Sequence, residues 1–210
     1  KKVVDDMGVL FPFEVKWYKK HNFHVNYFGH PLLDLYKGGG FIKKNKKNIT
    51  IGLFPGSRSQ EIKNHAPVLK KVILNLKKQF QNIQFLVGVT TTNFDEICSL
   101  LGLKKNDCGV VVNNSFGVFA QSDYAIVASG TATLECAITN TPFVVIYKTS
   151  FISWFLTSLF VRVKYASIVN ILAEKQLFPE CLQKDCNPLL VTKKILELIK
   201  TDSKQTQQEL

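Results

Sequence analysis

The 210-residue sequence lacks the cysteine patterns that define zinc sites and disulfide frameworks. Its five cysteines are an odd number, none of them forms a CxxC pair, and no paired histidines lie near them. We therefore expect no metal site and no set of structural disulfides, and a reducing compartment fits this cysteine usage best. Cys136 lies in an apolar helical segment and is expected to be a small buried side chain.

The sequence also lacks a recognisable signal peptide and any apolar run long enough to cross a membrane. The longest apolar stretch, 151–163, reads FISWFLTSLFVRV and is too short to span a bilayer. The chain begins at Lys1 and not at a methionine, within what looks like a structural element. We therefore expect a fragment or an N-terminally truncated chain.

Two common nucleotide-binding signatures are missing as well. Neither the dinucleotide pattern GxGxxG nor the phosphate loop GxxxxGK[ST] occurs, so motifs give NAD and ATP no support. Internal repeats, low-complexity tracts and the aromatic–basic motifs of nucleic-acid-binding modules are also absent. No nucleic acid is therefore expected among its partners, and the length of 210 residues predicts one main domain with an appendage.

Positive charge, in contrast, is in excess. The chain has 27 lysines and arginines against 16 acidic residues, a net charge of +11. Such an excess suits nucleotide phosphates or an anionic membrane surface, but it equally fits lysines that only solvate helix faces. Hydrophobic residues make up 46% of the chain, which is enough for a substantial buried core.

From residue 48 onward, short β-branched apolar runs alternate with helical patterns. The helix predicted over about 59–80 has apolar residues at the spacing of one buried face. The runs are continuously apolar and do not alternate with polar residues, which is typical of a parallel sheet covered on both faces. The sequence therefore predicts an α/β fold with a Rossmann-like, doubly wound parallel sheet. The predicted strands are 49–54, 83–88, 109–113, 124–128 and 143–147.

Further elements are expected on either side of this sheet. A stretch rich in glycine and lysine, 37–47, has the composition of a linker and marks a domain boundary. A polar tail, 201–210, is expected to fray. The other predicted elements are strands over 8–13 and 24–28 and helices over 14–20, 93–101, 131–139, 150–162 and 188–200.

Two loops at the expected carboxyl edge of the sheet contain residues suited to anions. In the first, LFPGSRSQE, Gly56 permits a tight turn, Ser57 offers a hydroxyl and an N–H, and Arg58 offers a planar fork for phosphate oxygens. Ser59 begins a helix whose positive end would face the same anion. The alternative is that Ser59 and Glu61 are plain capping residues, which leaves the arginine unexplained.

The second loop, VASGTATLE, follows the predicted strand 124–128. Ser129, Gly130 and Thr131 form a turn into a helix, and the backbone N–H groups of such a turn make a nest for anions. Small residues are also common at this place for packing alone. Glu135 lies about one helical turn beyond Thr131, near enough to accept hydrogen bonds from a ribose diol. The alternative is that Glu135 only complements the helix dipole.

These loops belong to a longer set of motifs that follow one another along the chain. The set comprises FPFE (11–14), FGHPLLD (28–34), LFPGSRSQEI (53–62), SDYAIVASGTATLECAI (122–138), PFVVIYK (142–148) and YASIVNILA (165–173). In this order and spacing, over about residues 8–195, the chain resembles the lipid-A-disaccharide synthases, a family of GT-B glycosyltransferases. Any one of the motifs alone would indicate only the wider GT-B class.

The resemblance implies an inverting glycosyltransferase that uses neither a metal nor another cofactor. Its substrates would be UDP-2,3-diacylglucosamine and 2,3-diacylglucosamine 1-phosphate, and its products the β-1′,6-linked lipid A disaccharide and UDP. Such an enzyme is cytoplasmic and peripherally associated with the inner face of the bacterial inner membrane. Residues 48–200 would be the C-terminal, UDP-sugar-binding lobe and residues 1–36 a remnant of the N-terminal, acceptor-binding lobe. The general base would then lie upstream of Lys1.

The resemblance also assigns roles to the two loops. Ser57 and Arg58 would face the diphosphate, whose negative charge grows as the glycosidic bond breaks. Residues 129–131 would donate hydrogen bonds to the same phosphates, and Glu135 would hold the ribose.

Two more residues match family positions outside these loops. Asn170 matches a position near the donor sugar or the cleft between the lobes, and its alternative role is a helix cap or turn. His30 matches the junction of the lobes, where it would line the cleft or be structural, since His-Pro turns are common.

The aromatic stretch 151–163 has two interpretations. Trp154, Phe155 and Phe160, followed by Arg162, suit an interfacial contact with an anionic membrane, which acylated substrates call for. Burial against the other lobe or in a homodimer interface would explain the same apolar residues.

Two other functions stay open from the residues alone. Another GT-B UDP-sugar transferase or a UDP-sugar epimerase would share the nucleotide-binding lobe, although FGHPLLD and the aromatic stretch argue against it. A non-catalytic nucleotide- or nucleic-acid-binding fragment would fit the sequence pI of about 9.4.

Overall fold

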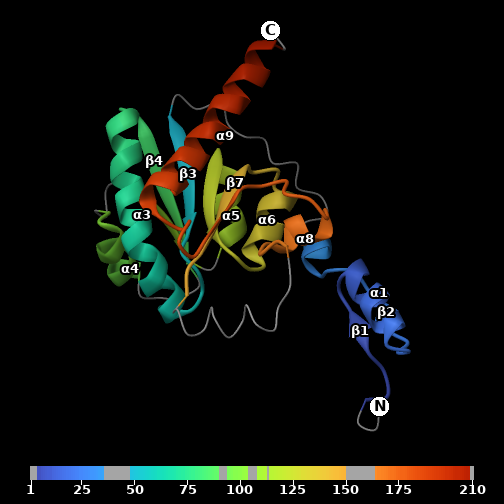
Figure 1. Ribbon diagram of the computed structural model, residues 1–210. Coiled ribbons are helices and arrows are strands. Elements are labelled where there is room, and N and C mark those ends of the chain that lie inside the picture. The colour runs from blue at the N-terminus through green and yellow to red at the C-terminus, as the bar shows by residue number, and fades with distance from the viewer. Residues whose placement is uncertain are drawn as a thin grey trace.

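The computed structural model describes two parts of the chain, which we call the N-terminal unit (4–35) and the lobe (48–208) (Figure 1). The described residues are 4–35, 48–89, 94–103, 108–112, 114–149 and 164–208. Several predictions fall outside them, namely the linker 37–47, the helix 150–162, and the residues Trp154, Phe155, Phe160 and Arg162.

The lobe is built on a parallel sheet of six strands in the order β5-β4-β3-β6-β7-β8. The chain winds outward from β3 in one direction and from β6 in the other, so the winding reverses between these two central strands. In open parallel sheets, ligands bind at the carboxyl ends of the strands where this reversal occurs. The strands are β3 (Ile49–Phe54), β4 (Ile83–Val89), β5 (Cys108–Val112), β6 (Tyr124–Ala128), β7 (Phe143–Tyr147) and β8 (Glu180–Leu182).

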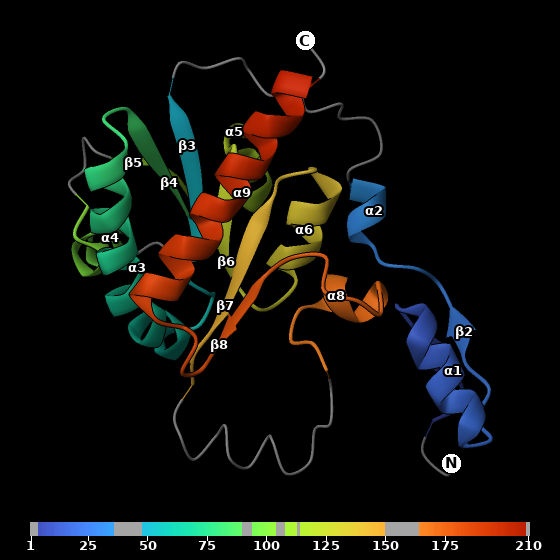
Figure 2. The same ribbon diagram turned by 45° about the horizontal axis from the view of Figure 1, so that its top comes forward.

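Helices cover both faces of this sheet (Figures 1 and 2). One face packs against α3, α4 and α9 and the other against α5, α6 and α8. Because strand side chains alternate between the faces, the lobe has two apolar cores: Ile51 and Leu53 enter the first and Phe54 the second. The helices are α3 (Ser59–Gln79), α4 (Phe94–Leu101), α5 (Ser115–Gln121), α6 (Ala132–Ile138), α8 (Ile168–Leu172) and α9 (Pro188–Gln208).

The predicted α/β fold with a doubly wound parallel sheet is confirmed, and so is the burial of Cys136. The sixth strand, β8, was not predicted because it is short and contains Glu180, so it lacks an apolar run. The last helix extends to Gln208, past the position where the polar composition predicted a frayed tail. Lysine and glutamine, which make up half of residues 201–208, are good helix formers, which explains this extension.

The N-terminal unit is a small parallel βαβ arrangement that ends in a short helix. Its strand β1 is shorter than the predicted 8–13, because Pro12 begins a helix in which the Glu14 carboxylate accepts hydrogen bonds from the N–H groups of Leu10 and Phe11. No side chain of this helix is buried. The elements are β1 (Gly8–Val9), α1 (Pro12–Lys20), β2 (Asn26–Tyr27) and α2 (Leu32–Leu35).

Candidate functional site

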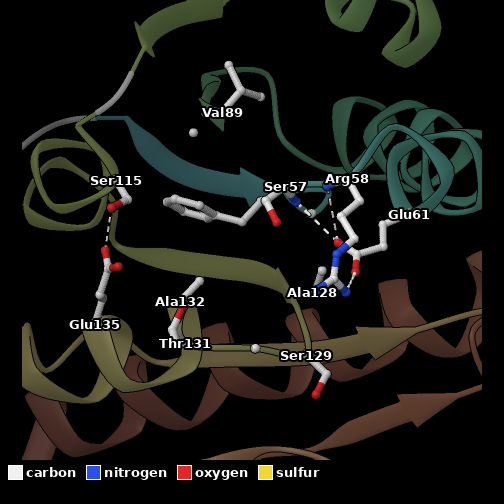
Figure 3. Close-up of a pocket in the computed structure, with 14 residues that line it drawn as sticks. Ser57, Arg58, Glu61, Val89, Ser115, Ala128, Ser129, Thr131, Ala132 and Glu135 are labelled. Carbon is white, nitrogen blue, oxygen red and sulfur yellow. Dashed lines mark hydrogen bonds and ion pairs between the residues drawn. The ribbon is translucent and has the colours of Figure 1, made fainter. Parts of the chain in front are cut away.

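A cavity of about 480 Å³ opens at the carboxyl edge of the sheet, where the winding reverses. The β3–α3 loop, the end of β4, the start of α5 and the β6–α6 loop line it (Figure 3). It therefore brings together all seven loop residues predicted from the sequence, which come from two separate motifs. The lining residues are Phe54, Gly56, Ser57, Arg58, Glu61, Gly88, Val89, Ser115, Ala128, Ser129, Gly130, Thr131, Ala132 and Glu135.

The β3–α3 loop is held in place by the first turn of α3. The Glu61 carboxylate accepts hydrogen bonds from the N–H groups of Ser57 and Arg58, at 3.2 and 3.4 Å, and lies 3.3 Å from the Arg58 guanidinium. Gly56 has a φ of 119°, which favours glycine, and a Cβ atom there would lie 2.6 Å from Glu61 Oε2. Glu61 is thus the capping residue of α3, and the Arg58 side chain, 83% exposed, is accessible to an anion at the cavity mouth.

Ser129 lines the cavity, but both of its hydrogen-bond donors are engaged within the fold. Its N–H donates to the Ile146 carbonyl at 3.0 Å, and its Oγ donates to the Ala166 carbonyl at 2.8 Å. Figure 3 shows its side chain pointing away from Ser57 and Glu135. In this structure neither donor of Ser129 is left over for a phosphate, and the role of Ser129 in binding the diphosphate stays a prediction.

The next residues of the β6–α6 loop differ from Ser129 in their backbone donors. No described residue accepts a hydrogen bond from the consecutive N–H groups of Gly130, Thr131 and Ala132. The turn is held from behind by Thr133, whose N–H and Oγ1 donate to the Gly130 carbonyl at 3.2 and 2.7 Å. Three consecutive donors of this kind are compatible with a nest for an anion, which stays a prediction.

A second polar pair lies at the other end of the cavity, across from Arg58 and Glu61 (Figure 3). There the Ser115 hydroxyl, at the start of α5, donates a hydrogen bond to the Glu135 carboxylate. Burial raises the pKa of the Glu135 carboxyl, and the hydrogen bond from Ser115 partly opposes this shift. The cavity therefore has a cationic group, Arg58, at one end and a carboxylate, Glu135, at the other.

Ser115 was not predicted as a site residue, although the sequence contains an indication of its position. Asn114 caps α5, because its Oδ1 accepts a hydrogen bond from the Gly117 N–H at 2.7 Å. An asparagine just after a predicted strand is a typical start of a helix. This cap places Ser115 in the first turn of α5, at the carboxyl edge of the sheet.

An aromatic ring forms one wall of the cavity. Phe54 stacks on Phe119 with ring centroids 3.9 Å apart. A Cβ atom on Gly88 would lie 2.2 Å from Phe54 Cε1, so the ring occupies the space that a side chain on β4 would need. The glycine at position 88 is therefore required by the close approach of this ring.

Asn170 lies outside the cavity lining and is fully buried in α8. Its Nδ2 donates to the Phe178 carbonyl and to Glu180 Oε1, both at 2.8 Å. Its Oδ1 accepts hydrogen bonds from the N–H groups of Leu177 and Phe178 at 2.9 and 3.0 Å. Since both ends of the amide are satisfied within the fold, the structure supports the alternative in which Asn170 orders a turn.

His30 lies in the N-terminal unit and not at the cavity. Its Nδ1 accepts a hydrogen bond from the Leu32 N–H at 3.2 Å, and its ring packs against Phe11 with centroids 5.4 Å apart. These local contacts support the structural alternative for His30.

The described part of the chain contains no group of three or more His, Cys, Asp or Glu side chains able to hold a metal ion. Likewise, none of the helices within the described ranges is long and apolar enough to cross a membrane. Among the lining residues, the donors open to an anion are the Arg58 guanidinium, the Ser57 hydroxyl and the N–H groups of residues 130–132, because the N–H groups of Ser57 and Arg58 donate to Glu61.

Comparisons with known proteins agree with the resemblance. The chain is 32% identical over 203 residues to lipid-A-disaccharide synthase 1 of Legionella pneumophila (strain Paris), covering 93% of this chain and 53% of that protein. It is 35% identical over 218 residues to the lipid-A-disaccharide synthase of Wigglesworthia glossinidia brevipalpis, covering 98% of this chain and 56% of that protein. The chain thus spans about half the length of the curated relatives it matches.

Among solved structures, the crystal structure of TarM superimposes with a TM-score of 0.52 at 13% identity, covering 96% of this chain and 38% of that chain. At this identity the likeness shows a shared fold and nothing more. The family described as lipid-A-disaccharide synthetase matches residues 1–210, and the chain therefore belongs to this family.

Proposed function

We propose that this chain is the nucleotide-binding part of a lipid-A-disaccharide synthase and that its cavity holds the UDP moiety of the sugar donor. The observation that carries this proposal is the juxtaposition of two loops at the reversal point between β3 and β6. Arg58 and the N–H groups of residues 130–132, which have no acceptor among the described residues, suit a diphosphate. The Ser115–Glu135 pair suits a ribose diol.

The same groups would assist departure of UDP. As the bond between the sugar and the diphosphate breaks, negative charge grows on the phosphate oxygens. Arg58, the amino-terminal end of α3 and the N–H groups of residues 130–132 would stabilise this charge without a metal. The Ser57 hydroxyl at the cavity mouth is a further donor to the same phosphates. Glu61 would keep the loop in place through the Ser57 and Arg58 N–H groups while the guanidinium turns to the ligand.

The reaction proposed is an inverting transfer of 2,3-diacylglucosamine from UDP to 2,3-diacylglucosamine 1-phosphate. The family resemblance supports these substrates and the β-1′,6 linkage of the product. Inversion by a single displacement needs a general base for the acceptor hydroxyl. We place this base in a second lobe, which corresponds to the part of the relatives that the chain does not match. The chain by itself is then expected to bind UDP without turnover.

Acylated substrates reside in a membrane, so the proposal includes a peripheral enzyme at the inner face of the bacterial inner membrane. The net charge of +11 supports contact with an anionic lipid surface. A homodimer is the alternative use of the aromatic stretch 151–163.

Calorimetric titration of the full chain with UDP tests the nucleotide site. We expect one saturable site, and Arg58→Ala should weaken binding by roughly 10- to 100-fold, because a hydrogen bond to a charged group contributes about 1.5–3 kcal/mol. Lys71→Ala is the matched control, since Lys71 is an exposed cation on α3 outside the cavity lining. Absence of UDP binding to the unmodified chain would contradict the proposal, and unchanged binding after Arg58→Ala would remove Arg58 from the phosphate role.

A second titration separates the proposal from another GT-B transferase or a UDP-sugar epimerase. UDP-2,3-diacylglucosamine and UDP-N-acetylglucosamine share the nucleotide and differ in their acyl chains. Tighter binding of the diacylated donor supports the synthase, and preference for UDP-N-acetylglucosamine, which has only a short acetyl group, supports the alternative.

A further inference from the structure

His65, in the second turn of α3, is fully buried, and both of its ring nitrogens have partners. Nδ1 lies 2.7 Å from the Pro55 carbonyl oxygen, and Nε2 lies 2.9 Å from the Lys148 nitrogen. A carbonyl can only accept a hydrogen bond and a backbone N–H can only donate one. The ring must therefore be neutral, with its proton on Nδ1 and an acceptor lone pair on Nε2.

These two hydrogen bonds join the first cavity loop to the end of β7. Pro55 directly precedes Gly56, and Lys148 directly follows β7, which is separated from β3 by β6 in the sheet. Asn64 adds a third bond, since its Nδ2 donates to the Lys148 carbonyl at 3.2 Å. The link through His65 thus spans the strand that leads to the second cavity loop.

The second loop is attached to the same strand. The Ser129 N–H donates to the carbonyl of Ile146, two residues before Lys148. The end of β7 therefore supports both loops, one through a backbone hydrogen bond and the other through the side chain of His65. Of these two attachments, only the one through His65 contains a group that changes charge near neutral pH.

The surroundings of His65 favour its neutral form. Burial lowers the pKa of His65 below 6.5, the Pro55 carbonyl and the Glu61 carboxylate act in the opposite direction, and Lys148 lowers the pKa further. The Tyr147 ring is the aromatic neighbour on β7, with its centroid 6.4 Å from that of His65. His65 is thus neutral at pH 7 and gains a proton only under acidic conditions.

We propose that His65 is a positioning residue for nucleotide binding, because its neutral ring holds the 55–58 loop against the end of β7. The inference rests on the proposed function of the cavity. Protonation would turn Nε2 into a donor that faces the Lys148 N–H, also a donor, and would bury a cation beside Lys148. The link to β7 then breaks, the loop that carries Arg58 loses its support, and the affinity for a nucleotide diphosphate falls.

Calorimetric titration of the full chain with UDP-N-acetylglucosamine, between about pH 8 and about pH 5, tests the inference over the range in which histidine changes charge. This probe is a diphosphate diester and, unlike free UDP, does not itself titrate in that range. Below the pKa of His65, the affinity of the unmodified chain should fall by up to about tenfold per pH unit.

Two substitutions test whether protonation of His65 causes the loss of affinity in acid. In His65→Gln the amide still offers one donor and one acceptor but does not titrate, so affinity at neutral pH should stay near that of the unmodified chain and the acid decline should shrink. His65→Leu lacks both groups and should bind weakly at every pH. Every other ionisable group is the same in the unmodified chain and in both variants, so a pH effect that does not come from His65 appears in all three proteins. An identical acid decline in the unmodified chain and in His65→Gln would overturn the inference.

Amide hydrogen exchange, corrected for intrinsic rates, gives a readout that needs no ligand. Exchange at residues 56–58 and at Lys148 should accelerate in acid in the unmodified chain and not in His65→Gln. If the unmodified chain binds no UDP-sugar, the proposed function fails while this exchange difference still decides whether His65 positions the loop. Equal exchange in both proteins would overturn the positioning role, and the Gln comparison suffices if His65→Leu does not fold.

Discussion

The N-terminal unit and the lobe both contain parallel strands and helices, but they differ in how much apolar surface they cover. Among the described residues, nine exposed large apolar side chains lie in the short N-terminal unit and only five in the much longer lobe. A parallel sheet needs a covering layer on both faces, and two short strands with the helix α1 and the four-residue helix α2 cannot supply it. The lobe carries its own two layers, whereas the unit lacks them.

This difference bears on the expected organisation of the protein. The exposed side chains of the unit include Phe13, Trp17 and Phe28, which are residues suited to a core. The prediction that residues 1–36 are a remnant of a second lobe would explain their exposure, because the rest of that lobe would cover them. Similar local patterns therefore bury their apolar side chains only where a second layer covers the sheet.

The largest expected effect comes from truncating a phenylalanine in each region. Phe85 is fully buried in the lobe, and Phe85→Ala should lower the free energy of unfolding by roughly 3–5 kcal/mol. Phe28 is 76% exposed, and Phe28→Ala should change it by less than about 0.5 kcal/mol. Chemical denaturation of the full chain measures both. Similar losses for the two variants would mean that the unit is covered in solution, and a dependence of stability on protein concentration would then identify self-association.

A smaller effect is expected from adding a methyl group to a glycine that faces a phenylalanine ring. In the lobe, a Cβ atom on Gly88 would lie 2.2 Å from the buried Phe54 ring, so Gly88→Ala should cost roughly 1–3 kcal/mol and push the ring into the cavity. In the unit, a Cβ atom on Gly8 would lie 2.9 Å from Phe28, whose exposed ring can move away at little cost.

Thermal unfolding and UDP titration of Gly88→Ala and Gly8→Ala measure the effect of each substitution on stability and on nucleotide affinity. Only Gly88→Ala should lower stability and nucleotide affinity together. A loss of stability in Gly88→Ala with normal UDP binding would show that the Phe54 wall does not contact the nucleotide.

The smallest effect on stability is expected from Glu135→Gln in the cavity. Because the folded-state pKa of Glu135 is raised, its stabilising contribution is full at low pH and is lost as pH rises through the folded pKa. At pH 7 the variant should therefore melt at a higher temperature, by at most about 2–4 °C, the shift that about 1 kcal/mol produces in a protein of this size. The difference should vanish in acid.

The same variant should bind UDP roughly tenfold less tightly, since it loses a charged acceptor for hydroxyl groups. Glu14→Gln is the matched change in the N-terminal unit, where Glu14 caps an exposed helix. It should not raise the melting temperature and should leave UDP binding unchanged. Stabilisation by both variants would point to reduced charge in general, and not to the burial of Glu135.

Much of the lobe could be predicted because its strands are continuous apolar runs. The bounds of β3, β6 and β7 coincide with the predicted 49–54, 124–128 and 143–147. β8 escaped prediction because three residues with a central cysteine and a glutamate carry no periodicity, and pairing with β7 alone makes them a strand. Glu180 in this strand accepts hydrogen bonds from the N–H groups of Ala166 and Ser167, a role that spacing cannot reveal.

The candidate site was predictable to the level of its loops. Turn residues, an arginine and helix starts are local properties of a sequence, so the motifs around Arg58 and Gly130 indicated an anion site. Placing both motifs at one edge followed from the general rule for parallel sheets. The sequence did not show which donors and acceptors are already hydrogen-bonded within the fold, because their partners come from distant segments.

The sequence by itself determined the fold class, the succession of the central strands and helices along the chain, and the two loops that carry the candidate chemistry. Local periodicity and turn preferences suffice for these features. Tertiary structure alone decided that the hydroxyl of Ser129 is bound to the Ala166 carbonyl, that Asn170 is enclosed, and that His65 joins Pro55 to Lys148. In these cases the hydrogen-bond partner lies from eight to more than eighty residues away, and only packing of the sheet and its helices brings it within reach.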